Sequence, residues 1–177
     1  MLIGYRGSGK TSVGRKLADQ LWKEFVDVDE EVCHRFGDKS IKQIWDERGR
    51  KAFRNEECRV VADLLSKDDL VISLGGGTIT PPDDHCPIHC DCRCLIKQSK
   101  NTVRIYLKCE PEELYRRLSS DTKRIGSRPT QDRLSLEQIK SDLVEREPVY
   151  ESASDHIFDT THTDPSETAR FLIQRFL

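Results

Sequence analysis

The chain has 177 residues, of which 36% are hydrophobic and 34% are charged, and its formal net charge is −2. This length suits one domain with a single core, and a chain without a basic excess is not expected to bind nucleic acid in general. No apolar run is long enough to span a membrane, and the first residues do not resemble a signal or transit peptide. We therefore expect a soluble, cytoplasmic protein with one domain over residues 1–177, and we expect neither nucleic acid nor membrane as a partner. We also expect a monomer, an expectation that rests on no particular sequence feature.

Strand-like and helix-like segments alternate along the chain, which is typical of a parallel sheet with helices on both faces. A first strand is expected from Met1, and short apolar or alternating runs predict further strands at residues 24–29, 70–74, 102–107 and 156–159. Longer amphipathic runs predict helices at residues 12–22, 30–36, 40–48, 50–65, 111–118, 135–150 and 166–177. Between them, residues 78–101 are expected to be irregular, and residues 119–134 are expected to form a mobile basic loop.

The strongest motif is a phosphate-binding loop near the start of the chain. Gly4, Gly9, Lys10 and Thr11 fit the pattern G-x-x-x-x-G-K-[ST]. Glycines let backbone amides wrap a polyphosphate, while the lysine brings positive charge and the threonine hydroxyl ligates Mg²⁺. We expect the Lys10 side chain to face solvent before a nucleotide arrives. The alternative, a glycine-rich turn that matches by chance, is disfavoured by the strand and helix patterns on either side of the loop.

The second informative stretch is Asp27-Val28-Asp29. Residues i and i+2 of a strand point to the same side, so both carboxylates should project together from the strand's carboxyl end, where ligands bind in open α/β sheets. One carboxylate there can hold Mg²⁺ through water, and the other can accept a proton from a substrate hydroxyl. The alternative is a helix N-cap followed by solvated acids, because Asp29-Glu30-Glu31 suits a first helical turn.

Two weaker features follow. Gly75-Gly76-Gly77 comes directly after a predicted strand, so its amide groups can meet a ligand that no side chain obstructs; a flexible exit from the strand is the alternative. Arg54, Arg128 and Arg146 are isolated arginines, and an arginine in a cleft can clamp a carboxylate or phosphate. Taken singly, each could equally be a solvated surface residue.

In their order and spacing, these features resemble the shikimate kinase family. The resemblance spans almost the whole chain, is weakest from Ile79 to Asn101, and is carried by GYRGSGKT, FVDVDEEV, KAFRNEE, VISLGGGT, Arg128-Pro129, REPVYE and DTTHTDP. It implies a P-loop kinase fold: an α/β domain with a central parallel sheet of about five strands, helices on both faces, substrate-binding helices at about 30–65 and a lid at about 119–134. It also implies transfer of the γ-phosphoryl group of ATP to the 3-hydroxyl of shikimate, giving shikimate 3-phosphate and ADP in aromatic amino-acid biosynthesis.

The resemblance also implies roles for individual residues, with ATP and Mg²⁺ as cofactors and shikimate as the substrate. The residues expected to bind ATP are Gly7, Ser8, Gly9, Lys10, Thr11, Ser12, Arg117 and Arg128. His162 is a further candidate, in the stretch where the family often places an arginine. Thr11, together with Asp27 acting through water, is expected to hold Mg²⁺. The residues expected to bind shikimate are Asp29, Arg54, Gly76, Gly77 and Arg146, the two arginines taking its carboxylate and Asp29 its hydroxyls. The catalytic residues are expected to be Lys10, Asp29 and Arg128.

Several features depart from the family's pattern. The basic loop is longer than in compact members, and the stretch from Asp159 to Pro165 has no arginine where the family often places one. Four of the seven cysteines and two histidines fall between His85 and Cys94, which indicates either a small zinc site or a loop that tolerates cysteine. Two alternative functions remain: another small-molecule kinase, of the gluconate or nucleoside monophosphate type, and a catalytically silent relative that binds a nucleotide.

Overall fold

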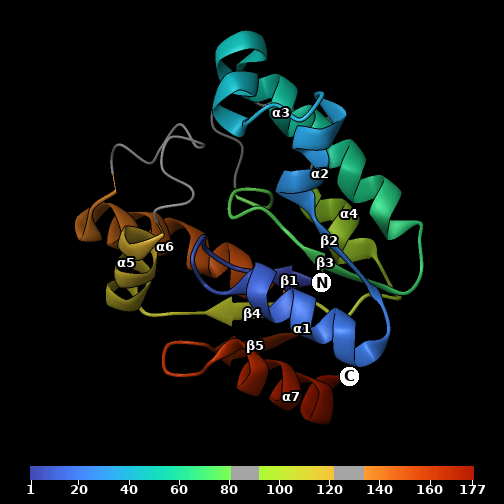
Figure 1. Ribbon diagram of the computed structural model, residues 1–177, viewed down its shortest axis with the longest axis vertical. Coiled ribbons are helices and arrows are strands. Elements are labelled where there is room, and N and C mark those ends of the chain that lie inside the picture. The colour runs from blue at the N-terminus through green and yellow to red at the C-terminus, as the bar shows by residue number, and fades with distance from the viewer. Residues whose placement is uncertain (81–91, 122–133) are drawn as a thin grey trace.

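The computed structural model describes residues 1–80, 92–121 and 134–177, and within them a parallel sheet of five strands lies between helices (Figure 1). The strands are β1 (Leu2–Ile3), β2 (Glu24–Asp27), β3 (Leu70–Ser73), β4 (Ile105–Lys108) and β5 (His156–Asp159), in the order β2-β3-β1-β4-β5. The helices are α1 (Lys10–Leu21), α2 (Val28–Arg35), α3 (Ile41–Leu65), α4 (Cys92–Gln98), α5 (Pro111–Ser120), α6 (Leu136–Ser152) and α7 (Pro165–Phe176). The predicted α/β fold with a central parallel sheet is confirmed.

Strand side chains divide the core into two layers, because successive residues of a strand point to opposite faces of the sheet. On β4, Ile105 and Leu107 pack with residues of α1 and α7, while Tyr106 between them packs with residues of α2, α3 and α6. All three side chains are buried. Figure 1 shows α1 and α7 side by side along one face, with the other helices on the opposite side of the sheet or at its edge.

This topology brings the carboxyl ends of β1, β2 and β3 to one edge of the sheet, the usual position of ligands in open α/β sheets. The loop from Gly4 to Gly9 leaves β1 at that edge and leads directly into α1. Gly9 is the N-cap of α1 and has a φ of 95°, a left-handed conformation that favours glycine. The positive end of the α1 dipole therefore faces the same edge.

The predicted strand at residues 24–29 is two residues too long. β2 ends at Asp27, which is the N-cap of α2: its carboxylate accepts a hydrogen bond of 3.1 Å from the backbone N–H of Asp29. Asp29 thus lies in the first turn of α2 together with Glu30 and Glu31, where the helix dipole favours acidic side chains. The alternative interpretation of this stretch as an N-cap is therefore correct for the local structure.

Other elements also differ from the prediction. β4 begins three residues later than expected, at Ile105. α1 begins at Lys10, because the helix starts inside the phosphate loop motif. The expected break at Gly49 is a kink (φ 80°, ψ 158°) between two helical halves of α3, and Ser40 caps this helix as its sequence indicated. α4 occupies part of the segment expected to be irregular. It was missed because it is only seven residues long, although Cys92 and Ile96 on one of its faces are buried in the core.

Candidate active site

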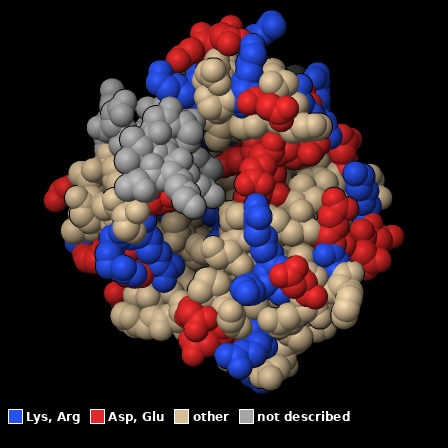
Figure 2. Space-filling model, in the orientation of Figure 1, with Lys and Arg blue, Asp and Glu red and all other residues tan. Residues whose placement is uncertain are grey.

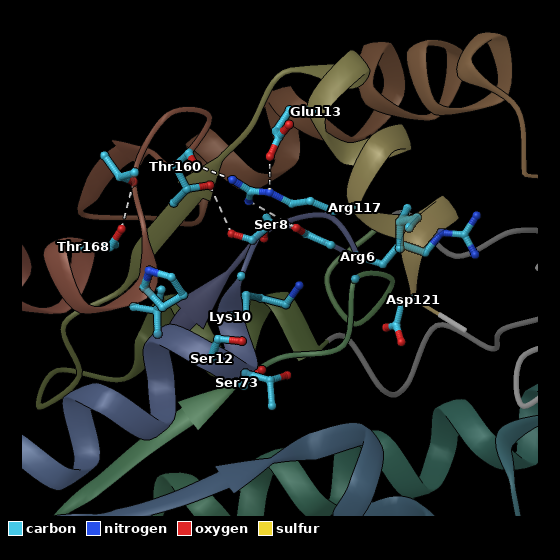
Figure 3. Close-up of a pocket in the computed structure, with 18 of the residues that line it drawn as sticks. Arg6, Ser8, Lys10, Ser12, Ser73, Glu113, Arg117, Asp121, Thr160 and Thr168 are labelled. Carbon is cyan, nitrogen blue, oxygen red and sulfur yellow. Dashed lines mark hydrogen bonds and ion pairs between the residues drawn. The ribbon is translucent and has the colours of Figure 1, made fainter. Parts of the chain in front are cut away.

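A cavity of about 690 Å³ lies over the phosphate loop. Figure 3 shows Lys10, Ser12 and Ser73 on one side of it, with Glu113 and Arg117 across from them. Every residue expected to bind ATP that falls within the described part of the chain lines this cavity: Gly7, Ser8, Gly9, Lys10, Thr11, Ser12, Arg117 and His162. Arg128 lies outside the described residues, as does most of the predicted lid.

The expectation that Lys10 faces solvent is wrong. Its side chain is largely buried, and its Nζ donates hydrogen bonds of 2.8 Å to the carbonyl oxygens of Gly4 and Tyr5. The loop wraps around the ammonium group because a buried charge needs polar partners. The lysine is therefore held inside the phosphate loop, at the floor of the cavity.

Three oxygen-bearing side chains meet beside this lysine, where β2, β3 and α1 come together. The hydroxyl groups of Thr11 and Ser73 both donate to Oδ2 of Asp27, at 3.0 and 3.2 Å. Oxygen ligands of this kind suit Mg²⁺, which is usually bound through one or two carboxylates together with phosphates and waters. Ser73 was missed from the sequence, although it ends its strand in direct register with Asp27.

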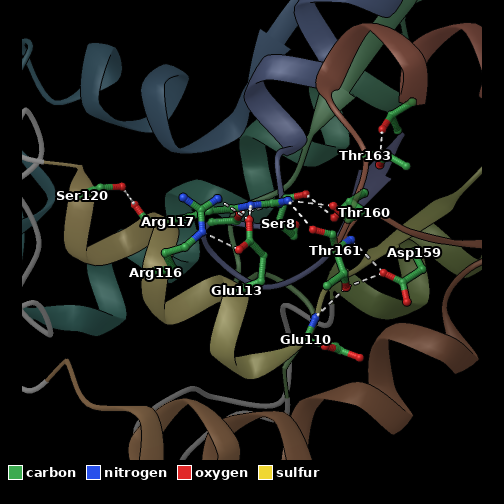
Figure 4. A network of polar contacts seen from close by, with 12 residues as sticks. Ser8, Glu110, Glu113, Arg116, Arg117, Ser120, Asp159, Thr160, Thr161 and Thr163 are labelled. Atoms are coloured by element: carbon green, nitrogen blue, oxygen red, sulfur yellow. Dashed lines mark hydrogen bonds and ion pairs between the residues drawn. The ribbon is translucent and has the colours of Figure 1, made fainter.

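Arg117 joins the phosphate loop to the segment after β5 (Figure 4). Its guanidinium donates to Glu113 one turn earlier in α5 (2.7 Å), to the carbonyl of Thr160 (2.7 Å) and, more weakly, to the carbonyl of Gly7 (3.4 Å). Hydrogen bonds from Arg116 and Arg117 lower the pKa of Glu113 to about 2. Arg117 therefore fixes one wall of the cavity through contacts within the protein.

A second cavity of about 260 Å³ opens between α3, α6 and the phosphate loop. All five residues expected to bind shikimate line it, namely Asp29, Arg54, Gly76, Gly77 and Arg146. Trp45 and Phe53 add an apolar wall, their rings in edge contact at 6.3 Å between centroids. The two cavities share Arg6, Asp29 and Gly76, so Asp29 lies where the two spaces meet.

Arg54 is held by a buried carboxylate. Its Nη1 lies 2.6 Å from Oε2 of Glu57, whose other oxygen accepts a 2.6 Å hydrogen bond from the hydroxyl of Thr78. Burial raises the pKa of Glu57, while the charge of Arg54 opposes that rise. A methyl group on Gly77 would overlap the Arg54 guanidinium. Glycine at this position therefore lets the backbone approach the arginine closely.

Arg146 faces the same cavity from α6. Its Nη2 lies 3.2 Å from Oδ2 of Asp142, one turn earlier in the helix. Tyr150, one turn later and fully buried, donates its hydroxyl to the carbonyl of Gly76. Neither Asp142 nor Tyr150 was recognised from the sequence, although their spacing of four residues from Arg146 places all three on one helix face.

The remaining sequence features are placed only in part. His85 to Asp91 lie outside the described residues, and within the described ranges no three potential His, Cys, Asp or Glu ligands gather as a metal site. On the face seen in Figure 2, Lys and Arg side chains are interspersed with Asp and Glu. Among the helices described, none is sufficiently long and apolar to cross a membrane.

A phosphate loop, an oxygen cluster suited to Mg²⁺ and a small second cavity that meets the first at a carboxylate define a P-loop kinase of a small molecule. The family model described as shikimate kinase matches residues 6–176. The chain therefore belongs to the shikimate kinase family.

Individual relatives agree with this assignment. A shikimate kinase from Hahella chejuensis is 36% identical over 98% of this chain and 83% of its own length, and one from Pelotomaculum thermopropionicum is 40% identical over 90% and 84%. Among solved structures, the shikimate kinase from Acinetobacter baumannii in complex with shikimate has a TM-score of 0.80 and 28% identity, and the match covers 98% of this chain and 89% of that one. The chain is thus a kinase, and this family is favoured over the gluconate-type and nucleoside monophosphate alternatives.

Proposed function

We propose that this protein transfers the γ-phosphoryl group of ATP to the 3-hydroxyl of shikimate. The observation that carries the proposal is the meeting of two cavities at Asp29, one over the phosphate loop and one lined by Arg54 and Arg146. Phosphoryl transfer requires a donor and an acceptor in line, with charge neutralised around them, and little covalent chemistry from the protein. Two adjoining cavities would let a nucleotide and an acceptor meet at their junction, with Lys10 on the donor side and a carboxylate beside the reacting hydroxyl.

On the donor side, the amide groups of the loop and the N-terminus of α1 would surround the phosphates of ATP. Lys10 would exchange its contacts with the Gly4 and Tyr5 carbonyls for phosphate oxygens, which are better partners for an ammonium group. Mg²⁺, when bound, neutralises phosphate charge. The Thr11 hydroxyl and the Asp27 carboxylate would hold it, and Ser73 would orient the carboxylate.

On the acceptor side, Arg54 and Arg146 would bind the carboxylate of shikimate, because a guanidinium matches a carboxylate in shape and charge. Asp29 would then meet the hydroxyl groups at the far end of the substrate, orient the reacting one and accept its proton. Gly76 and Gly77 would contribute backbone contacts. Glu57 holds Arg54 in place, so the arginine is oriented before the substrate arrives.

Three further assignments complete the proposal. Arg117, together with His162, would bound the nucleotide cavity and shape it around ATP, because the contacts of Arg117 fix one wall of that cavity and His162 also lines it. Arg128, outside the described residues, keeps its expected role over the phosphates. Cytoplasmic location and the monomeric state stay predictions.

Separate binding measurements for the two ligands test this assignment. Arg54→Ala and Arg146→Ala should each weaken shikimate binding by roughly 2–5 kcal/mol, the range for removing one partner of a desolvated charge pair, and leave ATP binding nearly unchanged. Arg59→Ala is the matched control, because Arg59 is an exposed arginine on the same α3 helix. Equal losses for both ligands, or no loss for shikimate, would remove these arginines from the acceptor site.

A further inference from the structure

Asp142 lies between the phosphate loop and the arginine expected to bind the substrate carboxylate. Its Oδ2 accepts a 2.7 Å hydrogen bond from the hydroxyl of Tyr5, a residue of the phosphate loop, and lies 3.2 Å from Nη2 of Arg146. Its Oδ1 accepts a 2.8 Å hydrogen bond from the side-chain amide of Gln138. All four side chains line the second cavity, so each oxygen of this carboxylate has a donor within the site.

An acidic side chain is unexpected in a cavity that takes an anionic substrate, since it would repel the substrate carboxylate. The negative charge of Asp142 is balanced by the positive charge of Arg146, and its oxygens accept hydrogen bonds from two neutral donors, Tyr5 and Gln138. A guanidinium carries five N–H donors in a fixed fork, and the contact through Nη2 leaves others for a ligand. The contact with Asp142 therefore occupies one donor of Arg146 and restrains the directions in which its other donors point.

Tyr5 restrains the same arginine from a second direction. The guanidinium carbon of Arg146 lies 5.4 Å from the centroid of the Tyr5 ring, within the range of a cation–π contact. Burial and the hydrogen bond to Asp142 raise the pKa of Tyr5 to about 12. The hydroxyl therefore keeps its proton around neutral pH and serves as a constant donor to Asp142.

We propose that Asp142 is a positioning residue, which holds the Arg146 guanidinium against Tyr5 and so aims it at the carboxylate of the acceptor substrate. The inference rests on the Oδ2 atom of Asp142, which contacts both Tyr5 of the phosphate loop and Arg146. The inference rests on the proposed role of Arg146 in substrate binding, and it adds a residue that touches neither the reacting hydroxyl nor the transferred phosphoryl group.

Asp142→Asn tests this role, because asparagine keeps the size of the side chain and removes its charge. Hydrogen bonds to charged groups are strong but partly screened at a half-buried site, so we expect the dissociation constant for shikimate to rise roughly 5- to 20-fold. The dissociation constant for ATP should change less than about twofold. Tyr5→Phe removes only the hydroxyl and should shift shikimate binding in the same direction by a smaller factor. Val144→Ala, an exposed position on the same helix, is the control.

An Arg146→Ala background separates this inference from the proposed function. If Asp142 acts through Arg146, Asp142→Asn should cause no further loss of shikimate binding in that background. Weakened binding in Arg146→Ala but normal binding in Asp142→Asn would overturn the inference and leave the proposed function intact. Normal binding in Arg146→Ala would overturn the role of the arginine and the inference with it. Equal loss of ATP and shikimate binding in Asp142→Asn would indicate a structural role and would also overturn the inference.

Discussion

Asp27 and Asp29 are two residues apart, yet the fold gives their carboxylates different surroundings. Asp27 ends β2 and accepts hydrogen bonds from Thr11 and Ser73, so it belongs to the oxygen cluster beside the phosphate loop. Asp29 lies in the first turn of α2 and lines both cavities. If β2 continued through Asp29, the two carboxylates would point to the same side of the strand. Because α2 begins between them, the two carboxylates have different neighbours and different proposed roles.

Substitution of each acid by its amide tests this separation. Asp29→Asn should leave both ligands bound and lower turnover by about 10²–10⁴, the usual effect of removing a general base. The loss would be smaller if Asp29 mainly orients the hydroxyl. Asp27→Asn should instead raise the Mg²⁺ concentration that gives the half-maximal rate. The measurement is a Mg²⁺ titration of the rate in both variants, and a metal requirement shifted only by Asp29→Asn would reverse the assignment.

At the scale of single elements, the kink in α3 positions the acceptor cavity. The half of α3 before Gly49 supplies Ile41 and Trp45 to the cavity wall, and the half after it supplies Phe53 and Arg54. The backbone at Gly49 (φ 80°, ψ 158°) lies in a region populated almost only by glycine. The sequence predicted the break at Gly49 but not its effect on the acceptor cavity. That effect depends on both halves of α3 lining the same cavity, which only the folded chain shows.

Gly49→Ala tests the kink. A side chain here would be strained even though a Cβ would meet no neighbouring atom, so we expect the free energy of unfolding to fall by about 1–3 kcal/mol. Shikimate binding should weaken more than ATP binding, because the kink shapes only the acceptor cavity. Urea denaturation gives the stability, with Lys51→Ala as an exposed control on the same helix. Unchanged stability would show that the kink relaxes without cost.

Arg117 joins α5 to the segment after β5, and Glu113 holds this arginine in place. We therefore expect this contact to depend on pH through the ionisation of Glu113. Because Arg116 and Arg117 lower the pKa of this carboxylate to about 2, its ionised form stabilises the fold above its ordinary pKa, and that contribution is lost as the pH falls toward 2. Glu113→Gln should therefore lower Tm near neutral pH, and the difference from the wild type should shrink between about pH 4.5 and 2. Thermal melts across this range test the prediction, with Glu145→Gln as a surface control. A difference that is independent of pH would contradict it.

At the scale of the whole molecule, the sequence was most informative where local chemistry determines structure. The phosphate loop, the alternation of strands and helices and the triple glycine all follow from patterns of neighbouring residues, and they sufficed to predict the sheet and the place of the site. Most of the individual lining residues were expected only from the resemblance to the shikimate kinase family. The predictions failed where the folded path of a loop or the packing of distant elements decides. The burial of Lys10 depends on carbonyl groups of its own loop, and α4 forms because one of its faces packs into the core. The contacts of Asp142 and Ser73 join elements that are far apart in the chain.

The monomeric state is also a prediction at this scale. All the roles proposed above fall on residues of one chain, so catalysis as proposed calls on no partner subunit. We expect light scattering with size-exclusion chromatography to give a mass near 20.4 kDa, that of one chain. A mass near twice that value would contradict the expectation and would call for activity to be compared across protein concentrations.

The most direct test of the proposed function is ADP formation from ATP and Mg²⁺, measured with and without shikimate, with the phosphorylated product identified by NMR. The account predicts that ADP forms at an appreciable rate only with shikimate, in a one-to-one ratio with shikimate 3-phosphate. Lys10→Met should abolish the reaction, and a melting curve should establish whether this variant is folded, because Lys10 is buried and hydrogen-bonded. ADP formation that is indifferent to shikimate, faster with gluconate or a nucleoside monophosphate, or retained in Lys10→Met would contradict the account.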